Sequence, residues 1–194
     1  MSLTAFLQKV VEILDESAVP YMLTGSLAVV YYAVPRATQD IDIVIETEER
    51  GVERLVQGLL AVGWYVDRHA ALQAWRRRGQ FNAIEPESGW KADFIVRKDR
   101  PYSRIEFERR ARISLLGVEL AIASLEDVLI AKLEWGRLGD SALHRRDVAQ
   151  LVERRRADLD QVYLEKWIHQ LGLEAEWNRI QARVNEPPTS DEAE

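Results

Sequence analysis

The sequence contains no cysteine, which excludes disulfide bonds and thiolate metal ligands. It also lacks a long apolar run, since the longest, residues 27–34, is far shorter than a bilayer crossing requires. The N-terminus has neither the basic start nor the cleavage site of a secretion signal. We therefore expect a cytoplasmic protein without a membrane partner.

Basic residues are also in deficit. Lysine and arginine number 26 against 32 acidic residues, a net charge of −6 that argues against broad, sequence-independent nucleic-acid binding. The arginines cluster at 76–78, 109–110, 145–146 and 154–156, and we interpret these clusters as solvated helix faces and helix C-termini. A hydrophobic content of 47% is that of a folded globular protein.

Hydrophobic periodicity predicts a mixed α/β part followed by an all-helical part. We expect a core over residues 1–122, a helical segment over 123–185 packed on it, and a disordered tail over 186–194. Expected strands lie at residues 19–24, 41–45, 64–66, 81–85, 90–96, 111–115 and 118–121. Expected helices lie at residues 3–17, 26–33, 48–62, 69–78, 104–109, 124–138, 144–156, 159–171 and 173–184.

Two acids, Asp40 and Asp42, stand at the start of the strand predicted for residues 41–45. Residues two apart on a strand project to the same side, so both carboxylates face one way while Ile41 and Ile43 enter the core. Neighbouring carboxylates repel each other, and a divalent cation such as Mg²⁺ relieves that repulsion. The alternative is a pair of solvent-exposed acids, with Asp40 capping the preceding turn.

Gly25 and Ser26 stand where a predicted strand meets a predicted helix. Glycine permits close approach of the backbone to a ligand, and the amides that follow form an anion site. Ser26 adds a hydroxyl to that site. The alternative is that Ser26 only caps its helix.

Asp93 interrupts an otherwise apolar run that continues through residues 94–96. A carboxylate there costs stability unless its charge is satisfied. If its strand lies beside that of Asp40 and Asp42, the three acids can hold two metal ions about 4 Å apart, with Asp93 as general base or metal ligand. Otherwise Asp93 is an acid at the edge of the core, paired with Lys91 or with an arginine.

The ordered motif resembles the DNA polymerase beta-like nucleotidyltransferase superfamily over roughly residues 1–122. It consists of Gly25-Ser26, a helix and turn, Arg36-x-Thr38-x-Asp40-Ile-Asp42, and a hydrophobic strand. The resemblance implies an α+β fold, with a nucleotidyltransferase-like mixed sheet flanked by helices and a C-terminal all-helical segment. It also implies transfer of a nucleoside monophosphate from an NTP to an acceptor hydroxyl, with Mg²⁺ or Mn²⁺ as cofactor and release of pyrophosphate.

The same resemblance assigns roles to individual residues. The expected catalytic and metal-binding residues are Asp40, Asp42 and Asp93, although Glu85 and Glu87 compete for the place of the third acid. The expected nucleotide-binding residues are Gly25, Ser26, Arg36 and Lys132. Arg36 either contacts a phosphate or fixes the turn onto Asp42.

The sequence of this motif is similar to that of small stand-alone bacterial members of the superfamily, which include toxins of abortive-infection type. This similarity implies an antitoxin-like partner. The stretch from Glu126 to Arg137, with Asp147, is similar to their helical half. Lys132 then contacts a phosphate, pairs with Asp147, or extends its ammonium to solvent. The acceptor is an RNA end, a protein side chain or a small hydroxylated molecule. A nucleotide-binding module without turnover is the rival hypothesis.

Overall fold

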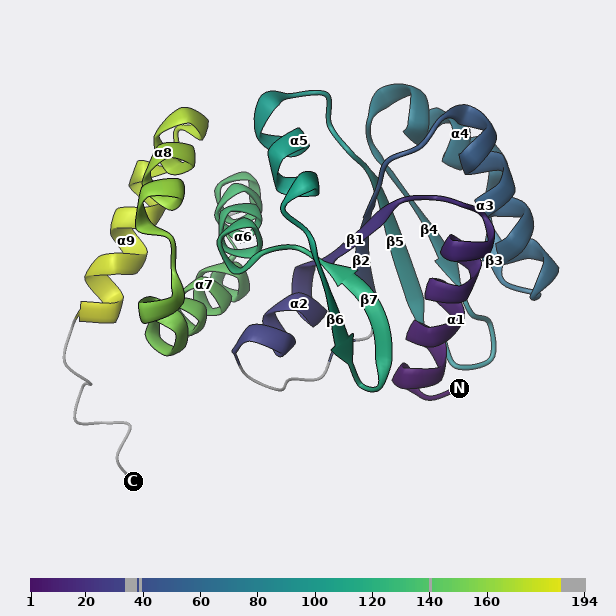
Figure 1. Ribbon diagram of the computed structural model, residues 1–194, viewed down its shortest axis with the longest axis horizontal. Coiled ribbons are helices and arrows are strands. Elements are labelled where there is room, and N and C mark those ends of the chain that lie inside the picture. The colour runs from purple at the N-terminus through teal and green to yellow at the C-terminus, as the bar shows by residue number, and fades with distance from the viewer. Residues whose placement is uncertain (34–37, 39, 140, 186–194) are drawn as a thin grey trace. The chain divides into compact units, whose positions relative to one another are not determined.

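The computed structural model describes residues 1–33, 38, 40–139 and 141–185 (Figure 1). The predictions for Arg36 and for the tail at 186–194 lie outside the described residues. The chain divides into two compact units, which we describe separately. The first contains the described residues of Met1–Tyr31 and Pro35–Ser124, and the second those of Tyr32–Val34 and Leu125–Glu194.

The described strands of the first unit form one mixed sheet of seven strands, in the order β3-β4-β5-β2-β1-β7-β6. The strands are β1 (Tyr21–Thr24), β2 (Asp40–Ile45), β3 (Tyr65–Val66), β4 (Gln80–Ile84), β5 (Lys91–Val96), β6 (Ala111–Leu115) and β7 (Val118–Ile122). β2 pairs in parallel with β5 and antiparallel with β1. The parallel pair is possible because a long crossover that includes two helices connects β2 to β5.

The helices of this unit are α1 (Leu3–Glu16), α2 (Gly25–Tyr32), α3 (Glu49–Ala61), α4 (Arg68–Arg77) and α5 (Pro101–Glu108). α1 packs against α3, and α3 packs against α4 (Figure 1). The buried residues of α1 recur at helical spacing, and Phe6 stacks on Trp64 with ring centroids 4.7 Å apart. The amphipathic pattern therefore gives the helices that the sequence predicted, with ends shifted by a few residues.

The two central strands have one apolar face and one polar face. Ile41, Ile43 and Phe94 are at most 1% exposed, whereas Asp42 and Asp93 project from the other side and are only partly buried. This alternation follows from the two-residue period of a strand. It delivers the acidic side chains to a common face of the sheet.

Helices, joined by short connections, make up the described regular structure of the second unit. It contains α6 (Leu125–Gly139), α7 (Ala142–Arg155), a 3₁₀ turn (Arg156–Asp158), α8 (Gln161–Leu171) and α9 (Glu174–Asn185). The helix predicted for residues 124–138 ends one residue later than predicted, and the 3₁₀ turn was not predicted. α7 begins earlier than the predicted residue 144, because the Ser141 hydroxyl accepts a hydrogen bond from the His144 amide and caps the helix at that point.

Across the described helices, none combines the length and the apolar character that a bilayer crossing requires.

Candidate active site

A row of polar side chains crosses four neighbouring strands of the first unit. Asp42 on β2 lies opposite Asp93 on β5, and the row continues to Thr24 on β1 and Asn82 on β4. Residues directly opposite in a sheet project from the same face, and neighbouring strands lie about 4.8 Å apart. The two carboxylates are therefore immediate neighbours. Thr24 and Asn82 were not predicted as site residues, since their place in the row depends on strand order.

Gly25 lets Asp42 approach the start of α2. It has a φ of +65°, and a Cβ placed on it would lie 1.9 Å from Asp42 Oδ2. The amide of Ser26 donates a hydrogen bond of 3.4 Å to the same oxygen. The Thr24 hydroxyl beside them is buried and has no hydrogen-bond partner among the described residues. The Gly-Ser turn, predicted as an anion site, thus binds a carboxylate of the protein itself.

Lys91 lies between two of the candidate acids. It is opposite Asp40 in the β2–β5 register, and its Nζ is 2.9 Å from Asp93 Oδ2 and 3.5 Å from Asp40 Oδ2. The hydrogen bond to Asp93 raises the pKa of the Lys91 ammonium, and partial burial opposes that shift. The side chains of Lys91 and Asp93 are 31% and 15% exposed, so solvent still reaches the pair. The pairing that the sequence analysis gave as an alternative for Asp93 is therefore present.

The carboxylates of Asp42 and Asp93 are ligands of the type that a hard divalent cation prefers, although no third acidic side chain joins them at one point among the described residues. Among the described residues, no group of three histidine, aspartate or glutamate side chains is placed to hold a metal ion. Asp42 and Asp93 nevertheless offer carboxylate oxygens from adjacent strands, the type of ligand that Mg²⁺ prefers. The contact of the Lys91 ammonium with both Asp40 and Asp93 was not predicted.

Glu85, a competing candidate for the third acid, stabilises the turn between β4 and β5. Its carboxylate accepts hydrogen bonds from the amides of Glu87 (2.9 Å) and Ser88 (2.8 Å) and from the Ser88 hydroxyl. The Ser88 hydroxyl and these amides lower the pKa of Glu85 from its ordinary value of 4.5. Glu85 is therefore engaged in the turn between β4 and β5.

Replacing Glu85 by glutamine should lower the melting temperature at pH 7. Because the folded pKa is depressed, the carboxylate stabilises the protein above pH 4.5, and this stabilisation is lost as pH falls through the folded pKa. The difference between Glu85→Gln and wild type should therefore shrink in melting curves recorded from pH 7 to pH 3. Glu87→Gln is the matched control, and equal melting temperatures for the two variants at pH 7 would contradict the assignment.

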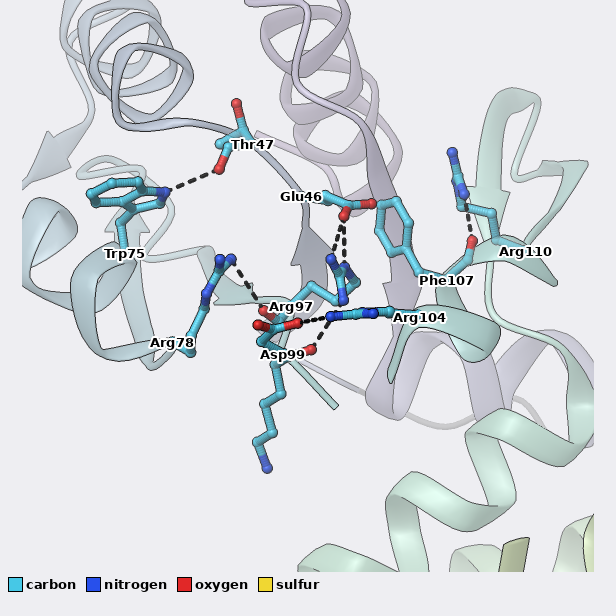
Figure 2. A network of polar contacts seen from close by, with 10 residues as sticks. Glu46, Thr47, Trp75, Arg78, Arg97, Asp99, Arg104, Phe107 and Arg110 are labelled. Carbon is cyan, nitrogen blue, oxygen red and sulfur yellow. Dashed lines mark hydrogen bonds and ion pairs between the residues drawn. The ribbon is translucent and has the colours of Figure 1, made fainter. Parts of the chain in front are cut away.

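A second polar cluster lies at the opposite ends of β2 and β5 (Figure 2). Glu46 directly follows β2, and Arg97 directly follows β5. Nε and Nη2 of Arg97 both donate hydrogen bonds to Oε1 of Glu46, the one from Nε at 2.9 Å. Arg104 on α5 donates a hydrogen bond to Asp99, which lies in the loop between β5 and α5. Since Arg97 is only 11% exposed, this cluster fastens the carboxyl ends of the two strands whose other ends bear the acids.

Lys132 belongs to the second unit. Its Nζ lies 3.0 Å from Asp147 Oδ2, and the two side chains are 5% and 1% exposed. The buried pair that the sequence analysis offered as one alternative is thus present, and contact of Lys132 with a phosphate stays a prediction. Arg137 donates from Nη1 to the carbonyls of Leu171 and Gly172 and so caps the end of α8.

Comparison with solved structures identifies the fold. The solution structure of the antibiotic-resistance factor ANT(2'')-Ia aligns with a TM-score of 0.61 at 15% identity, over 91% of this chain and 96% of that one. The crystal structure of ANT(2'')-Ia with adenylyl-2''-tobramycin gives 0.56 at 14%, over 94% and 99%. The lincomycin-bound lincosamide antibiotic adenylyltransferase LnuA gives 0.52 at 15%, over 78% and 96%.

The chain therefore has the nucleotidyltransferase fold, and the predicted fold class is confirmed. No family model matches the sequence, and no curated protein matches it either.

Proposed function

We propose that this protein transfers a nucleoside monophosphate from an NTP to an acceptor hydroxyl and releases pyrophosphate. One observation carries the proposal: Asp42 and Asp93 lie side by side on parallel strands, and the Asp42 carboxylate reaches the start of α2 at Gly25 and Ser26. Carboxylates beside a helix N-terminus combine a cation site with a phosphate site. The fold shared with two antibiotic-modifying nucleotidyltransferases supports the same reaction class.

The residues divide the work between the two reactants. The amides at the start of α2 and the Ser26 hydroxyl bind the triphosphate, in the manner of other helix N-termini that bind anions. Asp42 and Asp93 would hold Mg²⁺ or Mn²⁺, which when bound neutralises charge on the phosphates, and Asp40, the other acid of the motif, contacts the Lys91 ammonium beside them. Catalysis then rests on positioning and charge neutralisation rather than on a covalent enzyme intermediate.

Asp93 serves the acceptor. One of its oxygens accepts a hydrogen bond from Lys91, and its carboxylate takes the proton of the acceptor hydroxyl. The acceptor oxygen forms a bond to the α-phosphorus as the bond from that phosphorus to the bridging oxygen breaks. The electron pair of the broken bond leaves with pyrophosphate, so atoms and charge balance without a further reactant.

The acceptor belongs to one of three classes: an RNA end, a protein side chain or a small hydroxylated molecule. Small molecules are to be tried first, because two structures with this fold contain bound adenylyl-2''-tobramycin and bound lincomycin. A more specific hypothesis is that the protein is a toxin of abortive-infection type with an antitoxin-like partner. The sequence of the motif from Arg36 to Asp42 supports it.

The decisive test is transfer of label from NTPs that carry ³²P at the α-phosphate. Wild type should label an acceptor from a panel of aminoglycosides, lincosamides, total RNA and cell extract, whereas Asp93→Asn should be slower by about 10²–10⁴-fold. Glu119→Gln, an exposed change on β7, is the control and should match wild type. Equal labelling by Asp93→Asn and wild type would overturn the proposal.

Nucleotide binding without turnover is the second candidate, favoured by the 2.9 Å contact that engages Asp93 with Lys91. Calorimetry with each MgNTP separates the two functions. Saturable binding that Asp42→Ala abolishes, without labelled product from any acceptor in the panel, would establish the binding module instead.

A further inference from the structure

The geometry points to Lys91 as a built-in cation of the candidate site. We infer that its ammonium occupies a place that a second divalent ion would otherwise take, so that the protein binds one divalent cation there and not two. This inference rests on the proposed function, because it concerns the same carboxylates. It differs from the two-ion arrangement expected from the sequence.

The place of Lys91 is fixed by the sheet. It precedes Asp93 by two residues, so both side chains leave β5 on the same face, and it lies opposite Asp40 on β2. Its Nζ contacts one oxygen of each acid, at 2.9 Å and 3.5 Å. Both contacts involve Oδ2, so the ammonium bridges two carboxylates from neighbouring strands as a metal ion would.

The charge of Lys91 disfavours a second divalent ion between Asp40 and Asp93. Its ammonium already contacts both carboxylates, so it offsets negative charge that would otherwise attract an ion to this place. Asp42 and Asp93 are the residues placed to hold the single ion, because they lie directly opposite each other on β2 and β5.

In the proposed reaction, Lys91 positions the carboxylate that accepts the proton of the acceptor hydroxyl. A lysine ammonium is a compact point charge that does not exchange with solvent ions, whereas a weakly held second metal ion does. Held by Asp93, the ammonium lies beside the carboxylate assigned to the acceptor hydroxyl. Lys91 is thus a positioning residue: it keeps Asp93 and Asp40 at fixed separation while the nucleotide is held on the Asp42 side.

The test counts bound Mn²⁺ by equilibrium dialysis and by the electron paramagnetic resonance signal of the free ion, without nucleotide and acceptor. Wild type should bind one ion per chain and Lys91→Met two, while Lys91→Arg, which keeps the charge, should bind one. Lys98→Met removes the same charge from the loop after β5 and should also bind one. Asp42→Asn should lower the affinity for the first ion at least tenfold.

Thermal unfolding provides a readout that does not depend on activity. Without metal, Lys91→Met should melt below wild type because Asp40 and Asp93 lose their counterion, and Mn²⁺ should raise its melting temperature more than that of wild type. One ion per chain in both wild type and Lys91→Met would overturn the inference and leave the proposed function standing. No bound ion in wild type, with or without NTP, would overturn both.

Discussion

Alanine at Gly25 should reduce nucleotidyl transfer by about 100-fold or more, because it displaces Asp42 from the position described above. A Cβ at this position would lie 1.9 Å from Asp42 Oδ2 and 2.5 Å from Asp42 Cγ, far inside van der Waals contact. The carboxylate must therefore move away from the start of α2. The measurement is the initial rate of label transfer, together with the number of bound Mn²⁺ ions, which should fall.

Gly63→Ala is the matched control for this change. Gly63 also has a positive φ, +79°, but a Cβ there meets no atom within 4 Å. Both variants therefore bear the backbone strain of alanine in the left-handed region, about 1–2 kcal/mol, and only Gly25→Ala disturbs the acid. Wild-type transfer and metal binding by Gly25→Ala would show that the position of Asp42 does not matter for the activity.

The individual motifs of the site were readable in the sequence because they are local. The Asp40–Asp42 spacing places both side chains on one face of any strand, and Gly25-Ser26 marks the change from strand to helix. The polar face of β5 was likewise visible as one acid in an apolar run. Such features depend only on neighbours in the chain, so the period of a strand is enough to predict them.

The pairing of Asp42 with Asp93 was a conditional prediction, because it requires β5 to lie beside β2 in a particular register. Between these strands the chain forms α3, α4, β3 and β4, and nothing local fixes how the crossover returns. Lys91 shows the same limit. Its two-residue spacing from Asp93 was visible, but its bridge to Asp40 depends on the register and changes the expected number of cations.

The Glu46–Arg97 pair was not predicted at all, for a related reason. Glu46 and Arg97 read as ordinary charged residues that end two hydrophobic strands. Only the parallel pairing of β2 with β5 brings them together. Figure 2 shows the resulting contact between the two side chains. Local chemistry therefore identified candidate residues, and long-range pairing decided which of them became partners.

In the helical unit, Lys132→Met should destabilise the protein by about 3–5 kcal/mol, because it leaves the Asp147 carboxylate buried without its ammonium partner. The two side chains are at most 5% exposed, so water cannot replace the lost partner without opening the structure. Asp147→Leu should cost a similar amount. Urea unfolding followed by tryptophan fluorescence measures both free energies, and a loss below 1 kcal/mol for either variant would contradict the buried pair.

The double variant separates a structural role of Lys132 from a role in binding phosphate. Lys132→Met with Asp147→Leu removes both charges, so it should recover most of the stability that either single variant loses. Asp158→Asn, which alters the exposed Arg155–Asp158 pair of the same unit, should cost less than about 1 kcal/mol. If the stable double variant binds MgATP as wild type does, Lys132 serves the fold alone. If its affinity for MgATP falls at least tenfold while its stability is restored, the ammonium also serves the nucleotide, as the motif predicted.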